Sequence, residues 1–420
     1  MTKVDTVVIG GGIVGLSCAY YCARRGQKVV LIERDTLESG VSTGNAGLVA
    51  FGHTPMPRPG VIKQTMRMLF DPINPLYVKP RFDLAMFKWF LDFRKACTQD
   101  RFNKCMKILT DLGWGAKECF EQIINEEMVN GEYRSVGWLD LCLTEERLKQ
   151  SHAEAELMRS YGYNVESLAG DGLRRHDPAV RDEVIGGAHY HDSAIVDPGR
   201  FVSELGRCLP ERGVIVRTKT EIKRILTKND RFVAVRTTGA ERIEANNLVL
   251  AAGIWTSQLA KTININIPMQ AGKGYHVNLT APKPMLTHGV VCAETYVAAT
   301  PMAGTLRLAG TIEFSGINDY VVQKRLNMLQ IGARKYIKGI GTSQSLSFWS
   351  GLRPCIADGL PAVGPTAQVK GVYFATGHAM MGFTLGPVTG RIISECIVDG
   401  KTEQDITLLS PDRFSRAGRG

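Results

Sequence analysis

The sequence contains no uninterrupted run of roughly 18 apolar residues, the length that a membrane-spanning helix needs, so we expect no such helix. Residues 1–5 do not begin the apolar core of a signal peptide, and no cleavage site follows, so secretion is not expected. No two of the ten cysteines form a C-x-x-C pair, and the 44 glycines follow no collagen-like period. These absences favour a cytoplasmic globular protein with reduced, mostly buried thiols.

The composition is that of a folded chain with a large core. Of the 420 residues, 44% are hydrophobic and 22% are charged. A chain of 420 residues is long enough for two or three units of ordinary domain size, or for one core domain with a large insertion. The net charge of +10 favours anionic partners. We expect no nucleic-acid binding, because no basic motif with interleaved aromatic residues is present.

A strand–helix–strand pattern opens the chain. Residues 6–9 are apolar and β-branched, which is typical of a buried parallel strand. Residues 16–25 predict a helix that ends at Gly26. Residues 28–32 predict a second strand, and Glu33 stands at its end.

Three glycines follow the first strand in G-x-G-x-x-G spacing: Gly10, Gly12 and Gly15. The first permits a tight turn, the second lets a pyrophosphate approach the backbone, and the third lets the helix pack closely on the strand. The helix N-terminus offers free N–H groups to the phosphates, and Glu33 can accept both hydroxyls of an adenosine ribose. The pattern predicts dinucleotide binding, against the alternative of a structural glycine-rich turn.

FAD fits the pattern better than NAD. A flavoprotein that uses NAD(P)H usually carries a second strand–G-x-G-x-x-G–helix unit, and none is present. Two glycine-bearing strands are predicted far downstream, at residues 247–253 and 372–378. Small residues at such strand ends let a long ligand approach the backbone. The alternative is two ordinary buried strands that end in turns.

Together these motifs resemble those of the FAD-dependent D-amino-acid-oxidase superfamily, and best its branch of glycine oxidase, sarcosine oxidase and bacterial D-amino acid dehydrogenase. The Asn-Ala-Gly loop at 45–47, the Lys-Gly-Tyr segment at 273–275 and the Ser-Pro-Asp-Arg-Phe tail at 410–414 are most similar to the last of these. Residues 53–190 match weakly. The matching stretches follow family order: 7–33, 42–47, 197–200, 249–255, 272–275, 351–354, 358–361, 375–382 and 410–414.

The resemblance and the predicted elements imply an α/β (α+β two-domain) fold: a Rossmann-like FAD-binding domain and a discontinuous substrate domain, built on a mixed or antiparallel sheet with helices. Ligand should lie where the domains meet. The FAD-binding domain is assigned to 1–53, 191–261 and 347–420, and the substrate domain to 54–190 and 262–346. Helices are predicted at 82–97, 102–125, 201–212 and 321–337, and further strands at 139–143, 214–217, 221–226 and 232–237.

The resemblance also implies FAD as the cofactor and a helix at 384–398 that points its N-terminus at the flavin pyrimidine ring, with Pro387 in the first turn. Sarcosine-oxidase-like relatives carry a lysine near this point, and Thr384 in its place argues against rapid reaction with oxygen. We expect FAD to contact Gly10, Gly12, Ile13, Val14, Gly15, Glu33, Arg34, Ser42, Thr43, Asn45, Ala46, Gly47, Leu48, Ile222, Ala252, Gly253, Trp255, Gly351, Arg353, Gly377, His378, Met381, Gly382 and Thr384.

Three side chains are candidates for the catalytic site. Arg353 can bind a carboxylate through two parallel hydrogen bonds, as the matching arginine does in glycine-oxidase-like relatives; alternatively it is a structural arginine in a turn. Tyr275 could bond the substrate or pack in the core, and on a strand only one of Tyr275 and His276 should face the pocket. His378 could donate to flavin or substrate, or make a structural hydrogen bond.

We expect no metal site. His189 and His191 are two residues apart and Asp192 follows them, which could mimic a metal-binding pair. We interpret this segment as the end of a surface strand.

The stretch from residue 53 to residue 107 holds eleven basic and four acidic residues, a net charge of +7. Basic charge mixed with apolar side chains suits peripheral contact with the inner face of the cell membrane, and it also suits a solvated face over an ordinary core. A membrane contact would fit electron transfer to a quinone or a partner protein. The apolar residues that look exposed are Met66, Met68, Leu69, Phe70, Met86, Phe87, Trp89, Phe90 and Leu91.

The favoured function is a FAD-dependent amino acid dehydrogenase, acting on D-amino acids by hydride transfer to flavin N5. The resulting imino acid would hydrolyse to a 2-oxo acid and ammonia. Glycine, N-methyl amino acids such as sarcosine, and cyclic imino acids such as D-proline or D-hydroxyproline are alternative substrates. An RNA-modifying or RNA-binding flavoprotein is an alternative of another class.

Overall fold

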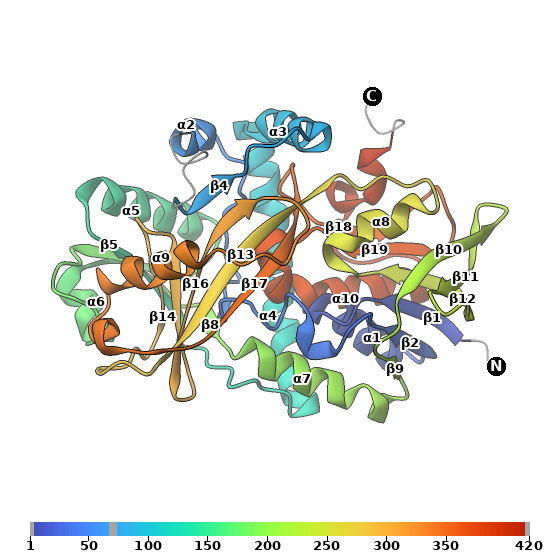
Figure 1. Ribbon diagram of the computed structural model, residues 1–420, viewed down its shortest axis with the longest axis horizontal. Coiled ribbons are helices and arrows are strands. Elements are labelled where there is room, and N and C mark those ends of the chain that lie inside the picture. The colour runs from blue at the N-terminus through green and yellow to red at the C-terminus, as the bar shows by residue number, and fades with distance from the viewer. Residues whose placement is uncertain (1–3, 67–73, 416–420) are drawn as a thin grey trace.

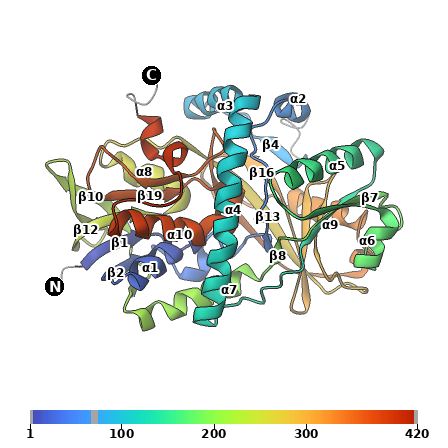
Figure 2. The ribbon, with the colours of Figure 1, turned by 180° about the vertical axis from the view of Figure 1, so that it is seen from behind.

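The computed structural model describes residues 4–66 and 74–415 of the chain. Within them, two sheets lie side by side and helices cover their faces (Figure 1, Figure 2). This confirms the predicted α/β architecture with a Rossmann-like sheet and a second, mixed sheet. Of the helices described, none combines the length and the hydropathy that crossing a bilayer requires.

The first sheet has a parallel centre. Its strands follow the order β10-β11-β12-β1-β2-β9, and β19 pairs with both β12 and β18. The strands β19, β12, β1, β2 and β9 run parallel, whereas β10 and β11 form an antiparallel extension of β12. The bounds are β1 (Val4–Ile9), β2 (Val29–Ile32), β9 (Ile215–Arg217), β10 (Ile222–Lys228), β11 (Arg231–Thr237), β12 (Arg242–Leu250), β18 (Ala362–Pro365) and β19 (Val372–Thr376).

The second sheet is mostly antiparallel. Its strands follow the order β17-β13-β16-β15-β14-β5-β7-β6, and β4 pairs with β16. The proposed domain boundary at residue 347 falls inside β17, which pairs with β13 along this sheet. The bounds are β4 (Leu76–Val78), β5 (Trp138–Cys142), β6 (Val165–Ala169), β7 (Gly186–Tyr190), β13 (Met269–Thr280), β14 (Gly289–Cys292), β15 (Val297–Met302), β16 (Thr305–Phe314) and β17 (Ser345–Ile356); β3 (Leu48–Val49) and β8 (Ala194–Ile195) form a separate pair.

The helices confirm most of the predicted ones and correct several of their ends, two of which follow. The Asp197 carboxylate caps α7 by accepting from the N–H groups of Gly199 and Arg200, so this helix starts at Pro198 instead of residue 201. Helix α10 starts at Gly382, which places Pro387 in its second turn. The bounds are α1 (Ile13–Arg24), α2 (Val61–Thr65), α3 (Leu84–Ala96), α4 (Gln99–Glu127), α5 (Glu145–Ser160), α6 (Gly170–His176), α7 (Pro198–Cys208), α8 (Thr256–Lys261), α9 (Gln323–Arg334) and α10 (Gly382–Val398).

The second sheet has two differently covered faces. Helices α6 and α9 pack on one face, which we call the α9 face, over alternate residues such as Leu139, Tyr275 and Val277. Helices α4 and α5 cover the residues of β5, β6 and β7 that point the other way, such as Tyr190; we call this the cavity face. Helix α9 lies in front of the sheet in Figure 1, and α4 and α5 come to the front in Figure 2.

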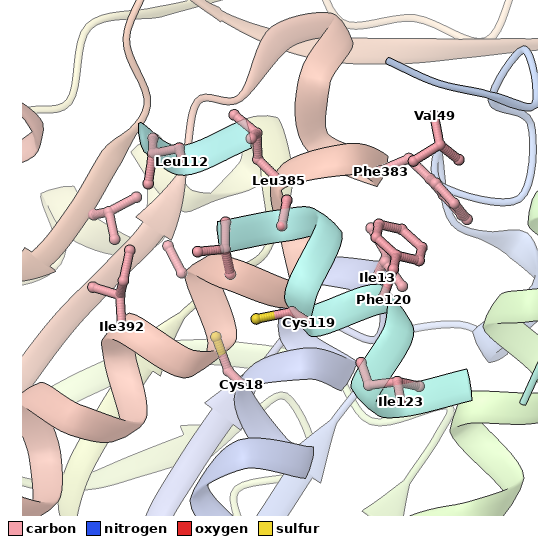
Figure 3. Close-up of a cluster of buried hydrophobic side chains, with 14 of the residues drawn as sticks. Ile13, Cys18, Val49, Leu112, Cys119, Phe120, Ile123, Phe383, Leu385 and Ile392 are labelled. Carbon is pink, nitrogen blue, oxygen red and sulfur yellow. The ribbon is translucent and has the colours of Figure 1, made fainter. Parts of the chain in front are cut away.

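Helix α4 joins the two sheets through a shared apolar core. Its residues Cys119, Phe120 and Ile123 are fully buried together with Cys18 of α1 and Leu385 of α10. Figure 3 shows these side chains meeting between the three helices.

All ten cysteines are free, and Cys97 alone is not buried, as expected for reduced packing residues. The prediction of thiols that serve as core side chains is therefore confirmed.

Candidate active site

The turn between β1 and α1 is shaped for close approach of a ligand. Gly10 has φ +112°, and a Cβ there would overlap the Ala251 carbonyl. A Cβ at Gly15 would overlap the Gly10 carbonyl, which agrees with the packing role expected of this glycine. At Gly12, by contrast, a Cβ would meet only the Ser42 hydroxyl, at 3.1 Å. The backbone of Gly12 is thus bare toward the cavity, as a pyrophosphate site requires.

Glu33 lies at the end of β2 and faces the same cavity. One carboxylate oxygen accepts from the Gly11 N–H at 2.6 Å and the other from the Asp35 N–H at 2.9 Å. These bonds fix the carboxylate, and each oxygen keeps a further lone pair for a ribose hydroxyl. The Arg34 guanidinium stacks on Trp255, 4.6 Å from the ring centroid, and closes this end of the cavity.

One large cavity links Glu33 to the second sheet. Its volume is about 1170 Å³, which exceeds the roughly 300–1,000 Å³ of sites for ordinary small ligands and suits a dinucleotide with a substrate beside it. The bare glycine turn, the fixed carboxylate and this volume fit FAD. The predicted cofactor residues that line the cavity are Gly10, Gly12, Ile13, Val14, Glu33, Arg34, Ser42, Asn45, Ala46, Ile222, Ala252, Gly253, Trp255, Arg353, His378 and Gly382.

The other eight predicted cofactor residues are not among those that line the cavity: Gly15, Thr43, Gly47, Leu48, Gly351, Gly377, Met381 and Thr384. Gly47 and Gly377 have φ values of +85° and +84°, so they shape turns. Gly351 leaves room for the Trp349 ring, and Leu48 pairs with Ile195.

Arg353 lies on the cavity face of β17. Its guanidinium lies over Gly274, where any side chain would overlap it, and Nη1 donates to the Thr311 carbonyl at 2.9 Å. Among the described residues no carboxylate lies within ion-pair distance of it, and burial lowers the pKa of the guanidinium. Arg353 sits within a regular strand, so the expected turn is wrong. A half-buried cation without a protein carboxylate beside it is suited to hold an anionic ligand.

Thr311 is a cavity residue that the sequence analysis missed. It has φ +61°, which is rare for a β-branched residue, and it stands where the pairing of β16 with β13 shifts register. Its hydroxyl is buried without a hydrogen-bond partner in the described chain. Bulges of this kind re-aim side chains near active sites, and this one turns the Thr311 carbonyl toward Arg353.

Tyr275 belongs to the opposite face of the sheet. Its hydroxyl donates to the Glu313 carboxylate at 2.8 Å, and the Arg325 guanidinium of α9 lies over its ring, 5.7 Å from the centroid. Tyr275 touches the cavity wall, but its hydroxyl is engaged in the core under α9. The neighbouring His276 points the other way, to the Gly44 carbonyl at 3.0 Å, as alternation along a strand requires.

His378 lines the cavity just before α10 and is held from behind. Its Nε2 lies 2.9 Å from the Thr389 hydroxyl. Burial lowers the pKa of this imidazole to about 4, so His378 is neutral at pH 7. It can therefore orient a ligand by a hydrogen bond, but it adds no positive charge.

Aromatic side chains form the walls around Arg353. Trp349 stacks on His276 with an interplanar angle of 14° and packs on Gly44. Trp89 and Phe90 of α3 also line the cavity. Trp349 could have been predicted, because Trp349, Gly351 and Arg353 alternate along one strand and so share a face.

The basic stretch at 53–107 differs in part from expectation. Met86 and Trp89 are 6% and 4% exposed, and the Trp89 indole N–H donates to the Cys355 carbonyl, so their expected exposure is wrong. Phe87, Leu91 and Met66 are exposed as expected, and Phe90 is half-buried. Met68, Leu69, Phe70, and the charged Arg67 and Asp71, lie outside the described residues.

Comparison with known proteins agrees with this geometry. A family model described as FAD dependent oxidoreductase matches residues 5–396. The D-amino acid dehydrogenase of Rhizobium johnstonii is 30% identical over 98% of this chain and 100% of the relative. That of Helicobacter pylori is 28% identical over 99% and 100% of the two chains.

Solved structures share the fold at lower identity. Glycine oxidase from Geobacillus kaustophilus has a TM-score of 0.80 at 20% identity, covering 98% of this chain and 99% of the other. L-Proline dehydrogenase from P. horikoshii has a TM-score of 0.76 at 21% identity, covering 99% and 98%. With a family model matching nearly the whole chain and a cavity shaped for a dinucleotide, this chain belongs to the DAO family of FAD-dependent oxidoreductases.

Proposed function

We propose that this enzyme is a dehydrogenase that oxidises the C–N bond of D-amino acids. The observation that carries the proposal is Arg353, a half-buried guanidinium that faces the cavity and has no protein carboxylate within ion-pair distance in the described chain. The curated relatives named D-amino acid dehydrogenase support the choice of substrate. Bound FAD supplies the hydride acceptor, flavin N5.

The chain's own residues would position the substrate and exclude water. Arg353 binds the substrate carboxylate through its planar fork, and its bond to the Thr311 carbonyl keeps that fork in place. Trp89, Phe90 and Trp349 surround the substrate side chain and keep the site dry. The neutral His378 imidazole is available for a hydrogen bond, since its Nε2 is held by Thr389. The product imine then reacts with water to give a 2-oxo acid and ammonia.

The test is anaerobic bleaching of the bound flavin. We expect D-alanine-like substrates to bleach it, whereas their L-enantiomers and the matching amines without a carboxylate do so at least 100-fold more slowly. Bleaching by sarcosine, glycine or D-proline alone would replace the D-amino acid assignment by one of those substrates. Equal rates with and without the carboxylate would contradict the role of Arg353.

We propose further that electrons leave to a membrane quinone. An apolar surface beside the cavity mouth supports this proposal: Phe82 and Phe87 are 94% and 62% exposed, and Leu84 is also exposed. Phe87 lines the cavity as well, so this surface adjoins the site. Lys88 and Lys95 of α3 add positive charge, worth up to about 1 kcal/mol each beside anionic lipid.

Co-sedimentation with vesicles that contain anionic lipid tests the membrane contact. We expect binding that weakens at high salt and falls in a variant carrying Phe82→Ser and Phe87→Ser. A matched control is Ile331→Ser, which removes an apolar side chain that is 63% exposed on α9. Absence of vesicle binding would remove the membrane contact, and fast peroxide formation in air would favour an oxidase.

A further inference from the structure

A group of histidines gathers on the α9 face of the second sheet, away from the cavity. We call Glu166, His176, His189, His191 and His288 the histidine cluster. Glu166 of β6 and His189 of β7 stand directly opposite each other in the paired strands, so their side chains share a face. His176 ends α6, and His288 directly precedes β14. The cluster joins four segments that are distant in the sequence.

The side chains are close enough to share one ion. Ligand atoms of Glu166, His176 and His189 all lie within 4.8 Å of one another. The His189 ring centroid is 3.8 Å from that of His191 and 5.3 Å from that of His288. Zinc bonds of about 2.0–2.1 Å put tetrahedral ligands about 3.4 Å apart. Rotation of the exposed Glu166 and half-buried His176 side chains can shorten the distances between the ligand atoms to this value.

His189 has a free, buried nitrogen lone pair. Its Nε2 lies 3.2 Å from the Val136 carbonyl and must donate to it, which leaves Nδ1 as the unprotonated nitrogen. That Nδ1 is buried and has no hydrogen-bond partner in the described chain. Metal-binding histidines characteristically donate their second N–H to a carbonyl or carboxylate in this way. The segment does end a strand, since β7 ends at Tyr190, but His189 is buried, so the expected surface position is wrong for this residue.

The neighbouring charges also favour a cation. Asp177 is fully buried, and its carboxylate lies 3.6 Å from His288 Nδ1, so it orients that ring. The Glu166 carboxylate lies 3.5 Å from His191 Nε2. Of the two arginines of α6, Arg174 is paired with Asp171 and Arg175 is exposed.

We propose that the histidine cluster binds one divalent transition-metal ion, best matched by Zn²⁺, through Glu166, His176 and His189, with His191 or His288 as the fourth ligand. Imidazole and carboxylate ligands suit this class of ion. Because Glu166, His176 and His189 come from β6, α6 and β7, the ion cross-links one end of the second sheet. The site is structural, and it lies on the opposite face from the cavity.

The experiment uses tag-free holoenzyme that has been treated with a chelator and returned to metal-free buffer. We expect one Zn²⁺ per chain in an isothermal titration, and a rise in melting temperature on adding Zn²⁺. Co²⁺ in its place should give a tetrahedral visible spectrum at wavelengths longer than the flavin bands. No stoichiometric binding of either ion would overturn the proposal.

Variants on the less buried ligands locate the site without emptying the core. His176→Gln and Glu166→Gln should each weaken Zn²⁺ binding at least tenfold and reduce the rise in melting temperature. The matched control is His152→Gln on α5, whose ring contacts the Gly187 carbonyl on the cavity face; it should bind Zn²⁺ as the wild type does. Flavin content, measured in parallel, should be equal in all of them. Unchanged affinity in both cluster variants would place the ion elsewhere and overturn the assignment.

Discussion

Two arginines, the fully buried Arg325 and the half-buried Arg353, lie on opposite sides of the second sheet and differ in what balances their charge. Arg325 of α9 has a protein carboxylate beside it: its Nε lies 3.5 Å from Glu313, which also accepts from Tyr275. Within the described part of the chain, Arg353 of β17 donates to the Thr311 carbonyl, has no carboxylate within ion-pair distance, and faces the cavity. Burial lowers the pKa of both guanidinium groups. The difference separates a structural cation from one that is left for a ligand.

Replacement of Arg325 should cause the largest loss of stability. Arg325→Met leaves Glu313 as an uncompensated buried charge, which costs about 3–5 kcal/mol. Urea unfolding monitored by far-UV circular dichroism measures this loss of unfolding free energy. Changing Glu313→Leu in the same chain should recover part of the loss, and a loss confined to substrate affinity would contradict the structural role.

Arg353→Leu should show the reverse pattern. We expect kcat/KM for the D-amino acid to fall by roughly 100- to 1,000-fold, or about 3–4 kcal/mol, because the substrate carboxylate loses its ion pair. Flavin content and unfolding free energy should change little. Oxidation of an amine without a carboxylate is the internal control, and an equal loss on that amine would show that Arg353 does not act on the carboxylate.

Glu33→Ala should affect the cofactor end of the same cavity. Loss of charge-assisted bonds to the ribose should weaken FAD binding by about 2–3 kcal/mol, measured by titrating apoprotein. Substrate KM at saturating FAD should remain near the wild-type value. FAD affinity equal to wild type would contradict the assignment of Glu33.

The cavity face also holds His276, a titratable residue that stacks on Trp349. Its pKa is lowered from an ordinary 6.5 to about 4, mainly by burial and to a smaller extent by the positive charge of Arg307. The unfolded chain therefore binds more protons between these values, and stability is lost as pH falls from 6.5 toward 4. At pH 5 the shifted pKa of His276 should lower the free energy of unfolding by about 2 kcal/mol. His276→Gln should lose correspondingly less stability than wild type between pH 7 and pH 5, as measured by urea unfolding at the two pH values.

Tyr275→Phe should have the smallest effect. Removing its hydroxyl takes one bond from Glu313, and we expect a loss of about 1–2 kcal/mol in unfolding free energy. Because the hydroxyl lies on the α9 face, kcat/KM should stay within about threefold of wild type. A loss in kcat beyond tenfold would return Tyr275 to the catalytic site.

The sequence was sufficient where function depends on local spacing. Gly10, Gly12 and Glu33 could be placed because the turn, the helix and the strand end lie within one short segment. Arg353 lines the cavity, as the sequence analysis expected. Its position within a strand was not expected, because Gly351 and Pro354 indicated a turn. The strand persists there because β13 pairs with it along its length.

Other features depend on contacts that no spacing reveals. Thr311 takes a left-handed conformation only because β16 carries a bulge against β13. His176 and Glu166 come together with His189 only through the packing of α6 on β6 and β7. Such sites combine residues from several segments, so a single sequence without its fold does not identify them.

Helix α4 has a consequence for how ligands are exchanged. It has 29 residues and so is about 44 Å long. It packs on α1 and α10, which cover the first sheet, and on the cavity face of the second sheet. A hinge that swung the sheets apart would have to expose Phe120 and the apolar side chains around it. We therefore expect substrate and product to pass through local rearrangements near Phe87 and α2, which line the cavity, without a hinge motion between the two sheets.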